Sequence, residues 1–377
     1  MASNSLSDAR IAIVHDRLTG LGGGELFVFP LAKHYNADVF TARYDREKAL
    51  KLGFEEPNVN ALLKGSPTED AAAQSGVKRM QEALAFSRLD LSDYDAVVLS
   101  GNWAVFSARK NKDNLWYCHT PTRSIYDLHY FYLQQLREKS MASAALFKAW
   151  SYLWTPIDQR NFSNVNKVAV NSRNVGLRVQ RYYGRDDYSV INPLIFTESF
   201  KPSKPKGYYL SVTRITPMKR LDLQLDVFEE LPKEELVIVG TGDKGSSYQK
   251  RFQERVKKMH NVTWLENVSQ RELIDLYAHC KAVIQTPMFE DFGRVPVEAN
   301  ASGKACLAVN EEGMTESIVH GKTGLLIEQP YRENFTKAIK NFDSLGFKEK
   351  DCVENAKRFS EKEFFKKFDA ALSSVLA

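Results

Sequence analysis

The stretch FEDFGRVPVEANASGKACLA, residues 289–308, places Glu290 and Glu298 on either side of a glycine turn, with seven residues between them. Residues 281–287 form a short apolar run of strand length before it, and residues 295–302 are helix-forming and end before Gly303. The pattern predicts a strand, a loop and a helix. Glu290 then lies on the loop, and Glu298 lies in the first helical turns.

This predicted loop carries groups that can hold a sugar. The N–H groups of Asp291, Phe292 and Gly293 precede the helix and lack helical partners, so they can face an anion or sugar oxygens. A buried carboxylate that accepts from two vicinal hydroxyls gains charge-assisted hydrogen bonds of roughly 1.5–3 kcal/mol each. We therefore expect a sugar attached to a nucleotide as the ligand. Taken alone, Glu298 also fits a solvated first-turn residue that the helix dipole favours.

Strand and helix patterns alternate in both halves of the chain. In the first half, residues 10–16, 96–101, 115–120 and 167–172 are short apolar runs that end in polar residues; in the second half, residues 208–213, 236–240, 262–266, 282–287 and 305–310 repeat the pattern. At 377 residues the chain exceeds the size at which one core keeps growing. We predict an α/β protein with two Rossmann-like, doubly wound domains that face each other across a cleft.

The boundary between the halves is marked by composition. Residues 196–207 contain Pro202, Pro205 and several Lys and Ser residues, which is typical of a linker. The prediction is an N-terminal domain at residues 1–195, a C-terminal domain at residues 208–358 and a final amphipathic helix at residues 359–377.

Several motifs in chain order resemble the retaining glycosyltransferases of family 4. Residues 290–298 resemble the E-x7-E segment of that family, and EGMTE (residues 312–316) and HGKTG (residues 320–324) resemble its sequel. Upstream, SVTRITPMKRLD (residues 211–222) resembles the Arg/Lys element, and LVIVGTGDKG (residues 236–245), with Gly240 and Gly242, resembles the second glycine loop. The resemblance implies the GT-B fold, an acceptor-binding first domain, a donor-binding second domain and a closing helix that crosses back to the first domain.

The resemblance also assigns roles to the second half. Arg214 and Lys219 would stabilise the departing diphosphate. Glu290 and the N–H groups of residues 291–293 would position the sugar hydroxyls, and Glu298 would hold the ribose. The mechanism implied is a front-face substitution without an enzymic nucleophile. A solvated basic turn is the alternative for Arg214 and Lys219.

Candidate cleft residues also occur in the first half. His119, with Pro121 and Arg123, resembles the H-x-P-x-R element of the family, which places the histidine beside the reacting sugar. Asp16 follows the first strand and would border the acceptor. The loop with Gly22, Gly23 and Gly24 fails the G-x-G-x-x-G fingerprint, and the family uses it for close approach to phosphate or acceptor. Structural roles for the histidine and for the glycine turn are the alternatives.

No metal or cofactor is expected. The D-x-D triplet at residues 93–95 precedes an apolar strand and is interpreted as turn chemistry. The His and Cys residues lack zinc-ligand spacing. The four scattered cysteines are predicted to be small buried residues of a reducing compartment.

The composition favours the cytoplasm. The first ten residues lack the apolar core of a signal peptide, and no run approaches the roughly 18–20 apolar residues of a membrane span. The net charge of +5 is spread along the chain, which does not indicate nucleic acid. Aromatic and basic residues alternate between Trp116 and Trp154; this pattern fits either contact with a bilayer, at the inner face of the plasma membrane, or a helix that buries its aromatic side.

The substrates follow from the same resemblance. Residues 119–132 and 168–186 are most similar to mannosyltransferases that build surface or lipid-linked glycans, which favours GDP-mannose as donor and a glycan or lipid-linked acceptor. A UDP-sugar is the second choice. A nucleotide-sugar epimerase shares the architecture, and a non-catalytic sugar-binding subunit would lose the charged residues, which are all present.

Overall fold

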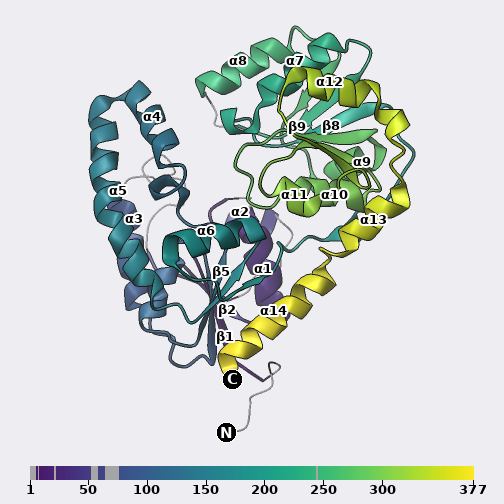
Figure 1. The fold of residues 1–377 in the computed structure, drawn as a ribbon. Helices are drawn as coiled ribbons and strands as arrows, with labels where there is room; N and C mark the ends of the chain where they lie inside the picture. Colours follow the sequence, from purple (N-terminus) through teal and green to yellow (C-terminus); the bar gives the residue numbers. More distant parts are fainter. Residues whose placement is uncertain (1–5, 7, 21–22, 52–57, 64–75, 243–244) are drawn as a thin grey trace. The chain divides into compact units, whose positions relative to one another are not determined.

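The computed structural model describes residues 6, 8–20, 23–51, 58–63, 76–242 and 245–377, which divide into two compact units (Figure 1). Unit 1 comprises residues Met1–Ile191 and Phe365–Ala377, and unit 2 comprises Asn192–Phe364. The chain therefore passes from unit 1 to unit 2 after Ile191 and returns at Phe365.

Unit 1 contains a seven-stranded parallel sheet in the order β3-β2-β1-β4-β5-β6-β7. Its strands are β1 (Ile11–His15), β2 (Asp38–Thr41), β3 (Val59–Ala61), β4 (Ala96–Ser100), β5 (Asn114–Cys118), β6 (Lys167–Val170) and β7 (Tyr188–Val190). Every residue of β1, β4 and β5 is buried, as expected for parallel strands that are covered on both faces.

The helices of unit 1 connect and cover these strands. They are α1 (Gly23–Tyr35), α2 (Arg46–Lys51), α3 (Gly76–Arg88), η1 (Ala104–Arg109), η2 (Arg123–Ile125), α4 (His129–Lys139), α5 (Met141–Phe162), α6 (Arg173–Tyr183) and α14 (Glu361–Leu376). Helix α6 shows how local sequence sets the ends: the Ser172 side chain accepts from the Val175 N–H at its start, and Gly184, at φ +69°, ends it.

The last helix, α14, packs on α1. Phe365 stacks on His34 with ring centroids 3.7 Å apart, and the Tyr35 hydroxyl donates to Asp369 Oδ1 over 2.6 Å. Phe368 is fully buried against Phe27. The regularly spaced aromatic residues of the C-terminal helix, Phe365 and Phe368, thus form its contact with α1.

Unit 2 repeats the architecture with a six-stranded parallel sheet in the order β10-β9-β8-β11-β12-β13. The strands are β8 (Tyr208–Val212), β9 (Glu235–Val239), β10 (Val262–Leu265), β11 (Ala282–Gln285), β12 (Cys306–Val309) and β13 (Gly324–Ile327). The helices are η3 (Thr197–Ser199), η4 (Pro217–Lys219), α7 (Leu221–Glu230), α8 (Ser247–Val256), α9 (Gln270–His279), α10 (Arg294–Ala301), α11 (Met314–Ser317), α12 (Arg332–Lys340), η5 (Phe342–Leu345) and α13 (Glu349–Lys357). Both sheets therefore have the strand order of doubly wound folds.

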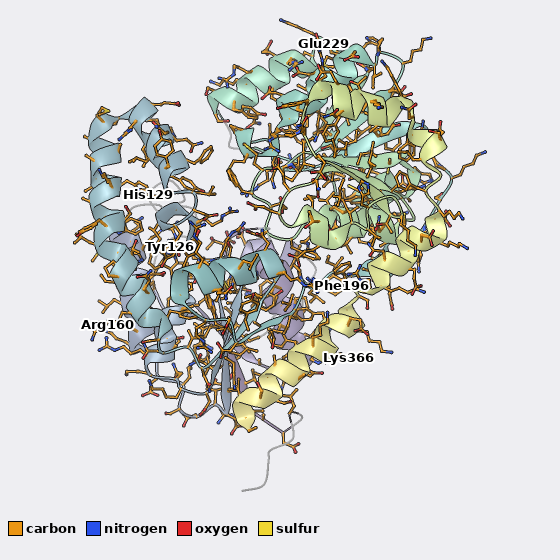
Figure 2. All side chains as sticks on the ribbon, in the orientation of Figure 1. Tyr126, His129, Arg160, Phe196, Glu229 and Lys366 are labelled. Atoms are coloured by element: carbon orange, nitrogen blue, oxygen red, sulfur yellow. The ribbon has the colours of Figure 1, made fainter. Side chains whose placement is uncertain are left out.

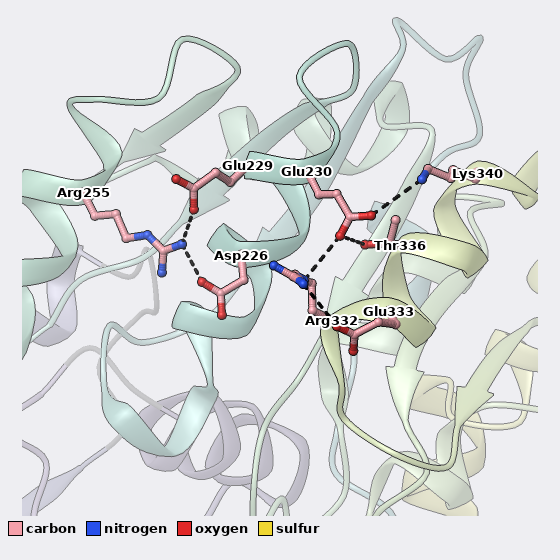
Figure 3. Close-up of polar contacts among 8 residues, drawn as sticks. All are labelled: Asp226, Glu229, Glu230, Arg255, Arg332, Glu333, Thr336 and Lys340. Atoms are coloured by element: carbon pink, nitrogen blue, oxygen red, sulfur yellow. Dashed lines mark hydrogen bonds and ion pairs between the residues drawn. The ribbon is translucent and has the colours of Figure 1, made fainter.

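Ion pairs on the surface of unit 2 tie α7 to its neighbouring helices (Figure 3). Arg255 of α8 donates to Asp226 and Glu229 of α7 over 2.5 and 2.8 Å. Glu230 lies 3.3 Å from Arg332 and 3.6 Å from Lys340, both in α12. Because these groups are largely exposed, we assign them a structural role in helix positioning.

Two further expectations concern the whole chain. All four cysteines are free and buried, which confirms their interpretation as small core residues. Within the described ranges, no helix combines the length and the apolar character that crossing a membrane requires.

Candidate functional site

The reversal of strand order in unit 2 lies between β8 and β11, which pair in parallel. Beyond β8 the order continues to β9, and beyond β11 it continues to β12 in the opposite direction. Open α/β sheets bind ligands at the carboxyl ends of such strands. Residues 213–220 follow β8 and carry Arg214 and Lys219, whereas residues 286–293 follow β11 and carry Glu290 and Asp291.

Hydrogen bonds join these two loops directly. The buried Thr286 hydroxyl donates to the Lys219 carbonyl over 2.8 Å and accepts from Gln224 Nε2 over 2.9 Å. The Met288 N–H donates to the Met218 carbonyl over 2.7 Å. Thr286 and Gln224 were not predicted as site residues. They hold the backbone of the basic turn against the acidic loop.

Lys219 and Glu290 form an ion pair across the joined loops. Lys219 Nζ lies 2.5 Å from Glu290 Oε2, and the two side chains are 21% and 26% exposed. An ammonium group carries three N–H donors, so Lys219 can bind Glu290 and an anionic ligand together. The structure thus brings a residue predicted to bind phosphate, Lys219, into contact with a residue predicted to bind the sugar, Glu290.

The two arginines of this turn, Arg214 and Arg220, differ from each other in their contacts. Arg214 is exposed, and within the described part of the chain its guanidinium has no ion-pair partner. Arg220 instead binds both carboxylate oxygens of Glu311 over 2.9 Å. Arg220 therefore anchors the turn to the segment after β12.

Backbone strain is concentrated around these loops. Five non-glycine residues of the described chain have positive φ, and three of them are Arg220 (+48°), Phe289 (+60°) and Glu312 (+42°). A Cβ on Gly313 would lie 2.4 Å from the Phe292 nitrogen, and the Gly313 N–H donates to the Glu290 carbonyl over 3.0 Å. Residues 311–314 therefore form a third segment of the site. Such conformations persist where the surrounding structure fixes them, which is common at functional sites.

Glu298 is held by other side chains. Its carboxylate is 14% exposed; Oε2 accepts from the Tyr277 hydroxyl over 2.7 Å, and Oε1 lies 3.7 Å from Arg294. Burial and the nearby Glu298 charge raise the pKa of Tyr277 well above its usual value, so this phenol stays a donor. The interpretation as a solvated first-turn residue is therefore wrong, because other side chains surround the carboxylate.

The other residues of unit 2 that were predicted for the site act through their packing and backbone conformation. The Phe292 side chain is buried and packs on Phe359 with ring centroids 5.3 Å apart. Gly293, at φ +81°, precedes α10. Gly240 has φ +145° and a Cβ there would lie 1.9 Å from the Thr213 carbonyl oxygen; a Cβ on Gly242 would lie 2.8 Å from that of Ile215. The glycines let the loop after β9 pack against the turn that carries Arg214.

In unit 1, Asp16 follows β1 at the corresponding reversal beside β4. Its carboxylate accepts from the N–H groups of Asn102, Trp103 and Ala104 over 2.7–2.9 Å and so holds the start of η1. Burial raises the pKa of Asp16, and the three amides oppose that shift. Asp16 therefore has a structural role, whether or not it also borders the acceptor.

The glycine loop lies beside the same strand. Gly22 is outside the described residues, and Gly23 is the first residue of α1. A Cβ on Gly24 would lie 2.7 Å from His15 Nε2. Close approach to the His15 ring therefore explains the third of these glycines.

His119 is linked to His15 through a serine. Ser100 Oγ lies 3.0 Å from His15 Nδ1 and 3.0 Å from His119 Nε2. Burial lowers the pKa of His15 to about 4, so its ring is neutral near pH 7. Ser100 lies at the end of β4 and was not predicted. Arg123 donates to Asp127 Oδ2 from two atoms, from Nη2 over 2.5 Å and from Nε over 2.9 Å.

The described residues contain no group of three or more His, Cys, Asp or Glu side chains that could hold a metal ion. The D-x-D triplet forms a turn before β4, in which Asp95 Oδ2 accepts from the Arg10 N–H over 2.7 Å. This agrees with its interpretation as turn chemistry. Transfer without a metal stays a prediction.

Known proteins resemble this chain in fold and sequence. HepE of Anabaena, solved in complex with UDP-glucose, matches with a TM-score of 0.73 and 18% identity, covering 97% of this chain and 100% of that protein. Alpha-1,3/1,6-mannosyltransferase ALG2 of Mus musculus is 29% identical over 371 residues, 86% of this chain and 85% of the relative. The corresponding protein of Dictyostelium discoideum is 24% identical over 430 residues, 98% of each chain.

The chain has the GT-B fold, which confirms the predicted fold class. Residues 195–359, which contain every site residue described above for unit 2, match the family of Glycosyl transferases group 1. This confirms the resemblance that the motifs after residue 211 predicted.

Proposed function

We propose that the protein is a retaining hexosyltransferase that moves mannose from GDP-mannose onto a glycan or lipid-linked acceptor in the cytoplasm. The mannosyltransferases that resemble it do so over most of their own length, which favours mannose. The observation that carries the transferase site is the Lys219–Glu290 pair at the point where strand order reverses, on the same turn as Arg214, which has no ion-pair partner among the described residues.

The two cations account for departure of the nucleotide. As the bond between the anomeric carbon and the diphosphate oxygen breaks, its electron pair passes to the diphosphate. Arg214 offers a forked guanidinium and Lys219 a point charge to that developing negative charge. Because the hydrogen bonds of Thr286 and Met288 fix the turn beforehand, little reorganisation accompanies the reaction.

The acidic residues orient the donor. Glu290 and the N–H groups of Asp291, Phe292 and Gly293 would bind sugar hydroxyls. Glu298 would bind the ribose hydroxyls through Oε1, which lies 3.7 Å from Arg294, while Oε2 accepts from Tyr277. In front-face substitution the acceptor hydroxyl attacks from the side of the leaving group, and its proton passes to a diphosphate oxygen. No enzymic nucleophile is then required.

Unit 1 would supply the acceptor side. We assign His119 to the reacting sugar, with Ser100 and the neutral His15 fixing its ring. The acceptor would be bordered by Asp16, Arg123 and the loop with Gly22, Gly23 and Gly24. For Asp16, Arg123 and Gly24 this role would add to the structural contacts described above.

The test is a transfer assay with labelled GDP-mannose and UDP-glucose, each with and without a membrane lipid extract. We expect mannose transfer from GDP-mannose that requires the extract, and an anomeric configuration in the product that matches the donor. Transfer only from the UDP-sugar would overturn the choice of donor, and an inverted product would overturn the mechanism. Conversion of the nucleotide sugar without any acceptor would identify an epimerase instead.

A further inference from the structure

Helix α5 is apolar on the side that faces the rest of unit 1. Trp154 is buried with its ring centroid 5.1 Å from that of Trp103 and 5.7 Å from that of Phe106. Phe162, two turns further on, is buried 5.3 Å from Trp116. Helix α5 therefore buries Trp154 and Phe162, whereas Tyr152 of the same helix is 82% exposed.

The opposite side of α5 is also apolar, and it is exposed. Its large side chains are 46–82% exposed: Met141, Leu146, Tyr152, Leu153 and Ile157. Alanines 142, 145 and 149 are exposed between them. Helical spacing places Met141, Tyr152 and the three alanines opposite Trp154, and Leu146, Leu153 and Ile157 along one flank of the helix. The outer side of a helix on a soluble domain is normally charged or polar, so this surface is adapted to contact something else.

The few charges of α5 identify the kind of surface that it fits. The helix has three charged residues, Lys148, Asp158 and Arg160. Asp158 points inward, where it accepts from the hydroxyls of Tyr126 and Tyr183 over 2.7 and 2.8 Å. Figure 2 shows Tyr126 on the inner side of the helix and Arg160 projecting from the outer side. The outer side therefore carries positive charge only.

The end of α4 adds to this charge, and the pair of helices is firmly attached. Arg137 and Lys139 are exposed just before α5, against one exposed acid, Glu138. His129 of α4 stacks on Phe147 of α5 with ring centroids 5.2 Å apart, and the Asp158 hydrogen bonds fix α5 to the rest of unit 1. The hairpin of α4 and α5 thus presents a fixed apolar surface with a basic end.

We propose that the outer face of α5 lies on the surface of an anionic lipid bilayer. An apolar helical face interrupted only by Lys and Arg is the pattern of helices that bind in the plane of an interface. The basic residues would meet lipid phosphates, and the leucines would enter the boundary between headgroups and acyl chains. A protein partner or a second copy of the chain would require no such bias toward positive charge.

Vesicle flotation of the purified full-length chain tests the proposal. The vesicles are phosphatidylcholine alone or with about one third phosphatidylglycerol, an anionic lipid. The test variant is Leu146→Glu with Leu153→Glu, and the matched control is Tyr331→Glu, which alters an exposed aromatic residue at the start of α12 in unit 2. Lys148→Glu tests the charge. All substituted side chains are exposed, so the variants should fold, which circular dichroism checks.

We expect the parent and Tyr331→Glu to float with the anionic vesicles and to bind phosphatidylcholine more weakly. The double variant should bind at least about tenfold more weakly, and Lys148→Glu about fivefold or more. Equal binding of the double variant, or no binding of the parent, would overturn the proposal. A parent dimer that the double variant dissociates, without vesicle binding, would overturn it in favour of an interface between copies. Flotation needs neither donor nor transfer, so its outcome is independent of the proposed activity.

Discussion

Replacing Lys219 by alanine separates the chemistry of the site from its stability. The substitution removes the ammonium group that lies 2.5 Å from Glu290 and leaves the neighbouring loop contacts in place, because Thr286 binds the backbone carbonyl of residue 219 and not its side chain. The proposed role of Lys219 is to stabilise charge on the departing diphosphate, so the loss should appear in turnover.

The structure sets the magnitude of both effects. Lys219 and Glu290 are about one-fifth to one-quarter exposed, and an ion pair screened by solvent to that extent contributes roughly 0–1 kcal/mol to folding. The thermal midpoint should therefore fall by about 3 °C at most. Removal of a preorganised donor to developing negative charge typically lowers kcat by about 10²–10³-fold, or roughly 2.7–4 kcal/mol.

The assay is initial-rate kinetics of GDP-mannose consumption with acceptor, together with thermal unfolding of the same preparations. Lys257→Ala is the matched control, since Lys257 is an exposed lysine of unit 2 that pairs with Glu254. The control should keep the parent rate. A Lys219→Ala enzyme with turnover within about threefold of the parent, at unchanged stability, would refute the assigned role.

Three further predictions concern the supports of the site. Tyr277→Phe removes the 2.7 Å bond to Glu298 and should raise KM for the donor about tenfold with little change in kcat; steady-state kinetics with a fall in kcat alone would contradict this. Gly240→Ala places a Cβ 1.9 Å from the Thr213 carbonyl oxygen at φ +145° and should lower the free energy of unfolding by about 3 kcal/mol or more, measured in urea; an unchanged midpoint would show that the loop tolerates the change. His15 has its pKa lowered by burial from 6.5 to about 4, so the unfolded state binds its proton first, and stability should fall as pH drops from about 6.5 to 4, by up to roughly 3 kcal/mol; urea midpoints against pH should flatten in His15→Gln, and identical slopes would contradict the assignment.

The sequence was sufficient for the strands that are apolar throughout. Residues 208–213 and 305–310 were predicted as strands and contain β8 and β12. The strand predicted at residues 236–240 is β9, and the helix predicted at residues 295–302 is α10, each displaced by one residue. Strands β2, β3, β7 and β13 were not predicted. Each has three or four residues and is only partly buried, so its pairing with a neighbouring strand, and not its own pattern, defines it.

The site could be predicted in its residue types but not in its contacts. The motifs indicated Lys219 and Glu290, whereas the bonds that join their loops come from Thr286 and Met288 to backbone carbonyls far along the chain. Similarly, the environment of Glu298 depends on Tyr277 of α9, and the residues around position 298 do not predict this contact. Such contacts depend on tertiary packing, which a single sequence does not encode in short-range periodicity.

Hydrogen exchange with and without GDP-mannose tests most directly whether the donor is held at the reversal between β8 and β11. The account predicts slower amide exchange in residues 213–220, 286–298 and 311–314 when the donor is bound. Protection confined to other segments would contradict it.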